Sequence, residues 1–222
     1  LAMTQDVRVI LIKLSDRLHN MQTIQSLDEN KKIRIAQETV DIYAPIANRL
    51  GLNNLYQELE DLCFEVLHPV RYKTIQKAIK ASRGNRREVI EKISNEISNK
   101  LKTVKTKAEI TGREKNPASI HRKMLEDQTG FNQINDIYAF RIIVSDINDC
   151  YLTLGTLHSL YNPIPGKFKD YIAIPKANGY QSLHSTLLGP FGVPVEIQIR
   201  TKNMHQLAEA GVAAHWLYKT KD

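Results

Sequence analysis

The chain has 222 residues, of which 42% are hydrophobic and 25% are charged, and its formal net charge is +7. These proportions are ordinary for a globular protein, and this length can bury one core, or one domain with a small appendage. The sequence contains no apolar run of the roughly 20 residues that span a membrane, and its start lacks the pattern of a secretory signal. Cys63 and Cys150 have neither metal-site spacing nor a disulfide framework. We therefore expect a cytoplasmic protein without membrane contacts.

The positive charge is concentrated in one stretch. Residues 71–107 contain twelve Lys or Arg and three Glu, so the rest of the chain is slightly acidic. Such a stretch binds the phosphates of a nucleic acid or a nucleotide, or it is simply a solvated helix face. Charge alone does not decide between these alternatives.

Helices dominate the first half of the chain. Apolar residues recur at steps of three and four in five segments, which we predict to be helices: 7–20, 31–50 with an interruption near Pro45, 52–67, 75–81 and 89–104. Pro69 either ends the third helix or opens the next one, and Ser82-Arg83-Gly84-Asn85 is predicted to break the helical run. Because the chain opens directly on a helix, we expect it to be cut from a longer protein.

Strands and helices mix in the second half. We predict strands over 104–111, 137–144, 171–174, 183–188 and 194–200, helices over 117–128, 152–160 and 204–218, and a loop around Pro163, Pro165 and Gly166. The order, helical first and mixed second, predicts an α+β fold in which a helical lead-in precedes a catalytic α+β domain.

The strand predicted over 194–200 alternates strictly. Apolar residues at 195, 197 and 199 share one face, and Glu196, Gln198 and Arg200 share the other. The polar face is either exposed to solvent or the floor of an active site, with a carboxylate, an amide and a guanidinium side by side.

The strand predicted over 137–144 brings two further charges. Asp136 at its mouth either holds Mg²⁺, a hard cation that takes carboxylate and phosphate oxygens, or caps a turn. Arg141 lies inside the apolar run, where it needs a carboxylate or a phosphate as a partner.

A cationic segment, GREKNPASIHRK over residues 112–123, precedes that strand. Gly112 permits a sharp turn, and Asn116-Pro117 suits the start of a helix, whose N-terminus favours anions. Lys123 follows Ser119 by one helical turn. The segment is similar to a phosphate clamp but is not a Walker loop, because the sequence contains no GxxxxGK[ST].

The segment PKANGYQSLH, residues 175–184, combines a tight Asn-Gly turn with side chains that suit a nucleotide. Tyr180 can stack on a base, Lys176 can meet a phosphate, and His184 can hydrogen-bond to either. The alternative is a hairpin turn with a packed tyrosine.

Together these segments resemble the synthetase domain of the RelA/SpoT homologue family. The matching stretches lie in order within residues 46–219: GREKNPASIHRKM, NDIYAFRIIV, PIPGKFKDYIAIPKANGYQSLHSTLLGP, VEIQIRT and MHQLAEAGVAAHWLYK. The resemblance implies a synthetase domain over 46–222, with a nucleotidyltransferase-like mixed sheet flanked by helices, after a helical remnant over 1–45. It also implies a GTP pyrophosphokinase of the stringent response, which transfers the pyrophosphoryl group of ATP to the 3′-hydroxyl of GTP or GDP to make (p)ppGpp.

The same resemblance implies roles for individual residues. Asp136 and Glu196 are the expected catalytic residues and Mg²⁺ ligands, and Glu196 holds the metal or activates the acceptor hydroxyl. The residues expected to bind ATP and its phosphates are Arg113, Lys115, Ser119, Lys123 and Arg141. Those expected to bind GTP or GDP are Lys176, Asn178, Tyr180 (stacked on guanine), Gln181 and His184.

Near the N-terminus, IKLSDRLHNM resembles the last metal-site motif of the family's HD-type hydrolase domain. Asp16 and Asn20 are four residues apart and share one helix face; in a full hydrolase they would be a Mn²⁺ ligand and part of the nucleotide pocket. The sequence contains no His-Asp dipeptide, so we expect no hydrolysis, and Mn²⁺ only where the missing half is present. Loss of the preceding helices would expose apolar residues within 7–18 and favour self-association.

Three functions follow as alternatives. The first is an active synthetase, and the second is a degenerate nucleotide-binding fragment that folds but turns over little. The third, a nucleic-acid-binding module built on residues 71–107, is disfavoured because Tyr72 is the one aromatic residue of that stretch and no reader motif is present.

Overall fold

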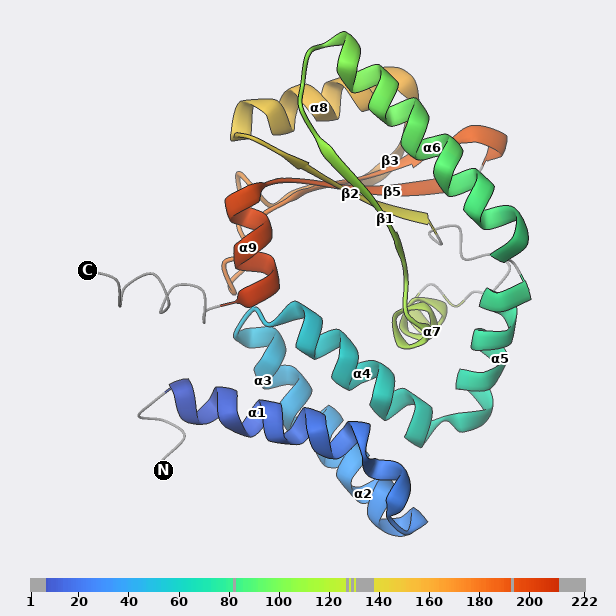
Figure 1. Cartoon of the computed structure of the whole chain (residues 1–222), viewed down its shortest axis with the longest axis vertical. Helices are drawn as coiled ribbons and strands as arrows, with labels where there is room; N and C mark the ends of the chain where they lie inside the picture. The colour runs from blue at the N-terminus through green and yellow to red at the C-terminus, as the bar shows by residue number, and fades with distance from the viewer. Residues whose placement is uncertain are drawn as a thin grey trace.

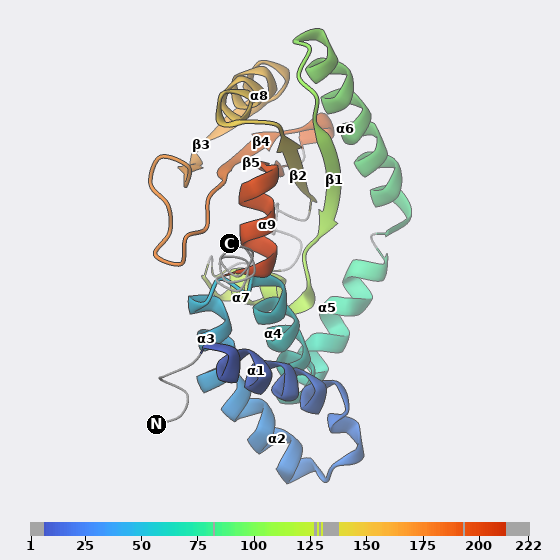
Figure 2. The ribbon, with the colours of Figure 1, turned by 60° about the vertical axis from the view of Figure 1, so that its left-hand side comes forward.

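A computed structural model describes residues 7–81, 83–126, 128, 130, 138–192 and 194–211, without the side chains of 83–87, 113, 114 and 191. Helices of the N-terminal part lie below a mixed sheet that has helices on both sides (Figures 1 and 2). This arrangement confirms the predicted α+β class, helical first and mixed second. Among the described helices, none has both the length and the apolar character needed to cross a bilayer.

Four α-helices form the N-terminal part: α1 (Val7–Gln22), α2 (Glu29–Glu38), α3 (Ala44–Arg49) and α4 (Asn53–Leu67). They share a core that includes Leu14 and Leu59. A π-helical turn, η3 (Thr39–Tyr43), separates α2 from α3, whose first turn contains Pro45. The predicted interruption near Pro45 is therefore confirmed.

The apolar stripe of α1 is mostly packed. Leu14 is 1% exposed, and Leu11 and Leu18 pack against the same core, whereas Ile12 is 68% exposed. Of the apolar residues expected to be exposed within 7–18, Ile12 is exposed, whereas Ile10, Leu11, Leu14 and Leu18 pack on the core of the four helices. Self-association through α1 stays a prediction.

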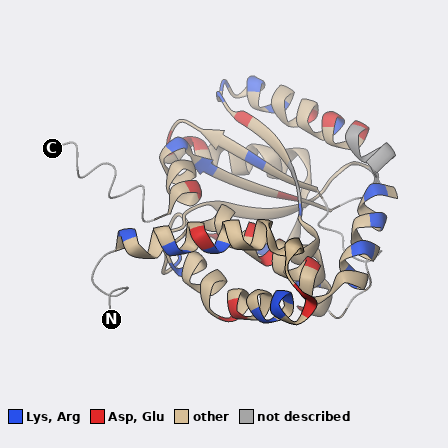
Figure 3. Ribbon diagram, turned by 60° about the horizontal axis from the view of Figure 1, so that its bottom comes forward, with Lys and Arg blue, Asp and Glu red and all other residues tan. Residues whose placement is uncertain are grey.

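Helices α5 (Pro69–Ala81) and α6 (Arg83–Thr103) lead to the sheet, so Pro69 opens a helix. The break predicted at residues 82–85 is wrong for 83–85, which lie within α6, and Ser82 lies outside the described residues. Basic residues follow the exposed side of α5 (Figure 3): Arg71, Lys73, Lys77 and Lys80.

Five strands form one sheet within the described part of the chain, in the order β1-β2-β5-β4-β3. Their bounds are Glu109–Glu114 (β1), Tyr138–Val144 (β2), Asn162–Asp170 (β3), Leu183–Leu188 (β4) and Pro194–Thr201 (β5). Strands β2 and β5 are parallel, and the other neighbours are antiparallel. Helices α6 and α8 (Ile147–Leu160) cover one face, where a buried core includes Ile97, Leu157, Phe140 and Ile197.

The strand predicted over 104–111 begins later than expected. Val104 and Lys105 form a turn after α6, with Lys105 at φ 58°. Gly112 lies within β1 and makes no sharp turn; a Cβ there would meet Cγ2 of Ile90 in α6 at 2.9 Å. Glycine at this position therefore serves the close approach of helix and strand.

Two expectations around β3 are also wrong. Pro163, Pro165 and Gly166 lie in a strand because β3 is at the edge of the sheet, where a missing amide donor is tolerated, and its register shifts between Pro163 and Phe168. Residues 171–174 form a turn, since the Asp170 carboxylate accepts hydrogen bonds from the amides of Ile172 and Ala173 at 2.9 and 2.8 Å.

On the other side of the sheet, α9 (Lys202–Ala210) contacts β2 and β5, and α4 contacts both α9 and α7 (Pro117–Glu126) (Figure 2). Within the described residues, the predicted helix over 204–218 corresponds to α9, which ends before Gly211, whose φ is 58°. Residues 212–222 lie outside the described residues.

Both cysteines are inaccessible. Cys63 and Cys150 are 0% exposed, and burial raises the pKa of each thiol to about 12. Because the thiolate is the reactive form, we expect neither thiol to react with Ellman's reagent at pH 8 in the native chain, and both to react in guanidinium chloride. Rapid release of the coloured thiolate before unfolding would contradict this burial.

Candidate active site

The face of the sheet opposite α6 and α8 carries a row of polar side chains. In the pairing register, Gln198 of β5 lies between Arg141 of β2 and His184 of β4, and Glu196 lies between Ala139 and Thr186. On the opposite face, the β5 residues Val195, Ile197 and Ile199 are 0% exposed. The predicted alternation of β5 is confirmed, and its polar face is turned toward α7 and α9 rather than toward open solvent.

Glu196 is held by neighbours from β4, from β5 itself and from the connection between β1 and α7. Lys115 Nζ lies 2.8 Å from one carboxylate oxygen, while Gln198 donates a 3.1 Å hydrogen bond to the other and His184 Nδ1 lies 3.8 Å from it. Burial alone would raise the pKa of Glu196, but Lys115 and the hydrogen bonds outweigh it and lower the pKa to about 2. The carboxylate is therefore ionised at neutral pH.

Tyr180 and His184 form a second polar contact at the end of the sheet. The Tyr180 hydroxyl lies 2.8 Å from His184 Nε2, and Lys176 Nζ lies 5.3 Å above the Tyr180 ring. The Asn-Gly turn is confirmed by Gly179, which has a φ of 76° and donates to the Lys176 carbonyl at 2.8 Å. Asn178 donates to the Asn48 carbonyl at 3.0 Å and so ties this turn to α3.

The protonation of His184 is a testable consequence of this packing. Burial, the largest cause, lowers the pKa of His184 from 6.5 to about 4. The unfolded chain thus takes up a proton first, so the contribution of this imidazole to stability is lost as pH falls from about 6.5 towards 4. We expect its ¹H NMR titration, assigned with His184→Gln, to have a midpoint near 4; a midpoint near 6.5 would contradict the neutral, buried imidazole.

A cationic cluster surrounds Glu209 of α9, which sequence reasoning missed. Its carboxylate lies 3.2 Å from Arg141 Nη1 and 3.3 Å from Arg200 Nη2, and it also accepts a hydrogen bond from Asn54 of α4. The carboxylate partner that Arg141 requires is therefore present. Arg200 is 2% exposed. Like Arg141, it is an arginine within a strand, and this second arginine is the sequence signal that could have predicted an acidic partner such as Glu209.

Two cavities adjoin on this face and share Gln57 and Gln198. The smaller, of about 230 Å³, is lined by Gln57, Lys115, Ser119, Arg122, Lys123, Glu126, Ala139, Glu196 and Gln198. The larger, of about 730 Å³, is lined by Asn48, Arg49, Asn53, Asn54, Gln57, Arg141, Lys176, Ala177, Asn178, Tyr180, His184, Gln198, Arg200, Ala208 and Glu209. Three residues predicted for ATP line the smaller cavity, and four predicted for the guanine nucleotide line the larger one.

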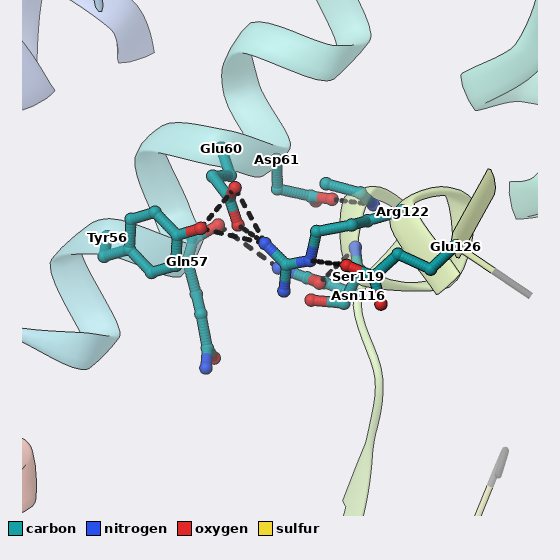
Figure 4. A network of polar contacts seen from close by, with 9 residues as sticks. Tyr56, Gln57, Glu60, Asp61, Asn116, Ser119, Arg122 and Glu126 are labelled. Atoms are coloured by element: carbon teal, nitrogen blue, oxygen red, sulfur yellow. Dashed lines mark hydrogen bonds and ion pairs between the residues drawn. The ribbon is translucent and has the colours of Figure 1, made fainter. Parts of the chain in front are cut away.

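The N-terminus of α7 is already occupied by protein groups (Figure 4). The amide of Ala118 donates to the Asp61 carboxylate, and that of Ser119 donates to the Asn116 side chain, both at 3.0 Å. This helix end favours an anion as predicted, but the anion is the Asp61 carboxylate, so the amides of Ala118 and Ser119 are already engaged within the protein. A phosphate in the smaller cavity would be met by the side chains instead.

The other predicted site residues are either not described or lie elsewhere than expected. Asp136 lies outside the described residues, as does the side chain of Arg113. Gln181 lines neither cavity and donates to the Ile172 carbonyl at 3.2 Å, whereas Arg141 lines the larger cavity. In the described part of the chain, no three His, Cys, Asp or Glu residues are arranged to hold a metal ion.

Asp16 and Asn20 lie on α1, which precedes all the strands of the sheet in the sequence. They share one helix face as predicted, and Asn20 donates to the Asp16 carboxylate at 3.3 Å. Both side chains are exposed. Neither lines either of the two cavities.

Known proteins resemble the chain over nearly its whole length. It is 57% identical to the bifunctional (p)ppGpp synthase/hydrolase SpoT of Escherichia coli K12 and 49% identical to a GTP pyrophosphokinase of Myxococcus xanthus, with 99% of the chain aligned in each case. The chain spans only 31% and 29% of the lengths of these relatives. Among solved structures, small alarmone synthetase 1 of Bacillus subtilis bound to pppGpp is 26% identical, with a TM-score of 0.47. The match covers 66% of this chain and 84% of the Bacillus chain.

Family models divide the chain. An HD domain model matches residues 1–53, and the model for the region found in RelA/SpoT proteins matches residues 112–222, half of the chain. This second match begins within β1 and contains every described element that follows it. The chain therefore belongs to the RelA/SpoT family.

Proposed function

We propose that the chain is a GTP pyrophosphokinase, which transfers the pyrophosphoryl group of ATP to the 3′-hydroxyl of GTP or GDP. The observation that carries this proposal is the pair of adjoining cavities on one face of the sheet, which share Gln57 and Gln198. A transfer between two nucleotides requires two sites whose reacting ends meet. The Myxococcus relative, a GTP pyrophosphokinase by name, supports the same reaction.

The smaller cavity is proposed to receive the triphosphate of ATP. Lys115, Ser119 and Lys123 supply two cations and a hydroxyl there, and phosphoryl-type transfer relies on positioning and charge neutralisation more than on covalent help from the protein. Arg113 is assigned to the same nucleotide from the family resemblance. Arg141, which lines the larger cavity, remains a phosphate-binding candidate next to the acceptor residues.

The larger cavity is proposed to receive GTP or GDP. Tyr180 offers a ring for stacking on guanine, and Lys176, Asn178 and His184 line the same cavity. Its volume of about 730 Å³ lies within the roughly 300–1,000 Å³ of typical ligand sites. Gln181 is proposed only as a support of this loop, through its bond to Ile172.

Glu196 stands at the junction of the two nucleotides in this scheme. With a pKa of about 2 it is a weak proton acceptor while Lys115 is its partner, so we favour a role as Mg²⁺ ligand together with Asp136. An ionised carboxylate is a donor that suits this ion, and bound Mg²⁺ would neutralise phosphate charge. The acceptor 3′-oxygen attacks the β-phosphorus, the bond from that phosphorus to the α–β bridging oxygen breaks, AMP leaves, and the hydroxyl proton passes to a base.

The test is incubation of the chain with labelled ATP, GTP or GDP, and Mg²⁺. The proposal requires AMP and a guanosine penta- or tetraphosphate in equal amounts. The alternative, a catalytically degenerate fragment of a bifunctional synthase/hydrolase, requires saturable nucleotide binding without either product. Salt-sensitive RNA binding without any nucleotide effect would support the nucleic-acid alternative.

Residues 1–45 are proposed to be the end of an HD-type domain, and residues 46–222 the synthetase domain. The HD domain match over residues 1–53 supports the first assignment. We propose that the chain alone does not hydrolyse (p)ppGpp. The resemblance identifies no hydrolase residues in it besides Asp16 and Asn20, and these two are too few to form the metal site. Release of pyrophosphate from labelled ppGpp by the chain with Mn²⁺ would overturn this proposal.

A further inference from the structure

Helix α4 belongs to neither matched region, apart from its first residue, yet it borders both cavities. The HD match ends at residue 53 and the RelA/SpoT match begins at 112. Gln57 of α4 lines both cavities, and Asn54 lines the larger one. The nucleotide site therefore includes a wall that the family assignment of residues 112–222 leaves out.

Four polar groups of α4 hold the helix that carries the proposed ATP residues (Figure 4). Asp61 caps the Ala118 amide at 3.0 Å, and the Gln57 carbonyl accepts a 3.2 Å hydrogen bond from Asn116. One turn further along α7, the two oxygens of Glu60 lie 2.8 and 2.7 Å from Arg122 Nη1. The Tyr56 hydroxyl accepts from the same nitrogen at 2.8 Å and donates to Glu60 at 2.6 Å.

These contacts fix the rotation of α7 about its own axis. The caps hold its start, and the ion pair of Glu60 with Arg122 holds its second turn. Ser119, Arg122 and Lys123 all line the smaller cavity. A rotation of α7 would therefore move all three side chains relative to Glu196 of β5 and its ion-pair partner Lys115.

We propose that Glu60 is a positioning residue for the triphosphate of the smaller cavity. It acts through Arg122: by engaging the guanidinium, it keeps α7 in the orientation that presents Ser119 and Lys123 to the phosphates. The identity of that triphosphate as ATP rests on the proposed function. The structural claim is that contacts from α4 determine how tightly the smaller cavity binds a triphosphate, and this claim does not depend on the proposed function.

The experiment compares Glu60→Gln, Arg122→Gln and the double variant. For each, the KM for ATP and for GTP is measured, with the dissociation constant of α,β-methylene-ATP from calorimetry and the unfolding midpoint in urea. We expect each single variant to raise the KM for ATP and the dissociation constant of the analogue about tenfold, with the KM for GTP changed less than about twofold. The double variant should match the single ones, because the two side chains act as one unit.

The chain contains a matched control. Arg17 and Glu38 form an ion pair of 3.1 Å, with the Arg17 guanidinium 4.0 Å above the Tyr43 ring, and neither charged residue lines the two cavities. Glu38→Gln thus removes the same kind of contact and should leave both KM values and the analogue affinity unchanged.

The outcomes separate this proposal from the proposed function. Wild-type affinity of Glu60→Gln for the analogue, equal rises of both KM values, or additive effects in the double variant would overturn the positioning role. A wild-type chain that binds the analogue but makes no product would overturn the synthetase, while a tenfold weaker analogue binding by Glu60→Gln would still support the positioning role.

Discussion

Glu196→Gln is expected to lower the rate of (p)ppGpp synthesis by about 10²–10⁴-fold, with an intact fold. The amide keeps the shape of the side chain and its contact with Gln198, but it removes the charge that faces Lys115 at 2.8 Å. Loss of that charge removes a metal ligand or a base, whichever role Glu196 has. The measurement is the initial rate of product formation at saturating ATP and GTP, with circular dichroism to check the fold.

A control for this variant is Glu29→Gln. Glu29 is likewise paired with a lysine, Lys32 at 3.6 Å, but it lies on α2, away from both cavities. It should keep the wild-type rate. More than about a tenth of the wild-type rate in Glu196→Gln would contradict the assigned role, and we expect the same loss from Asp136→Asn on the strength of the family resemblance.

Gly211→Ala is expected to destabilise the chain by about 2–4 kcal/mol, and to weaken binding of the guanine nucleotide. Gly211 has a φ of 58°, and a Cβ there would lie 2.5 Å from the Leu50 carbonyl oxygen and 2.9 Å from the Leu52 amide nitrogen. Both obstacles are backbone atoms, so α9 would have to move away from the N-terminal helices. Because α9 contributes Ala208 and Glu209 to the larger cavity, that cavity would change shape.

Urea unfolding and titration with GDP measure the two effects. Gly155→Ala is the matched substitution, since Gly155 lies within α8 and a Cβ there would meet nothing within 4 Å. It should be neutral or stabilise the chain by up to about 1 kcal/mol, as alanine is the better helix former. Equal stability of Gly211→Ala and the wild type would show that the contact of α9 with residues 50–52 is dispensable.

Local pattern predicted those parts of the site that depend on one segment alone. The alternation of β5 was sufficient to place Glu196 and Gln198 on one face, and the Asn-Gly dipeptide was sufficient to predict the tight turn before Tyr180. The partners across space were not predictable in this way. Asp61 caps Ala118 from 57 positions earlier in the chain, and nothing in the helical period of α4 marks it as the wall of a cavity.

Predictions based on proline and glycine were wrong where contacts with a neighbouring element decide the local structure. The sequence predicts a loop at Pro163 and Pro165. An edge strand, however, has one side without hydrogen-bonding partners and therefore tolerates proline. Gly112 was read as a turn, although close packing of Ile90 explains it. In both cases the neighbouring element, rather than the residue itself, determines the structure.

The parallel pairing of β2 with β5 has a consequence for biosynthesis. These neighbours in the sheet are separated in sequence by α8, β3 and β4, so a nascent chain on the ribosome has most of its helices before the two strands can meet. Pairings between distant segments form late and slowly. Arg141 and Gln198 become neighbours only at that step, so the proposed nucleotide site is complete only once β5 has paired with β2.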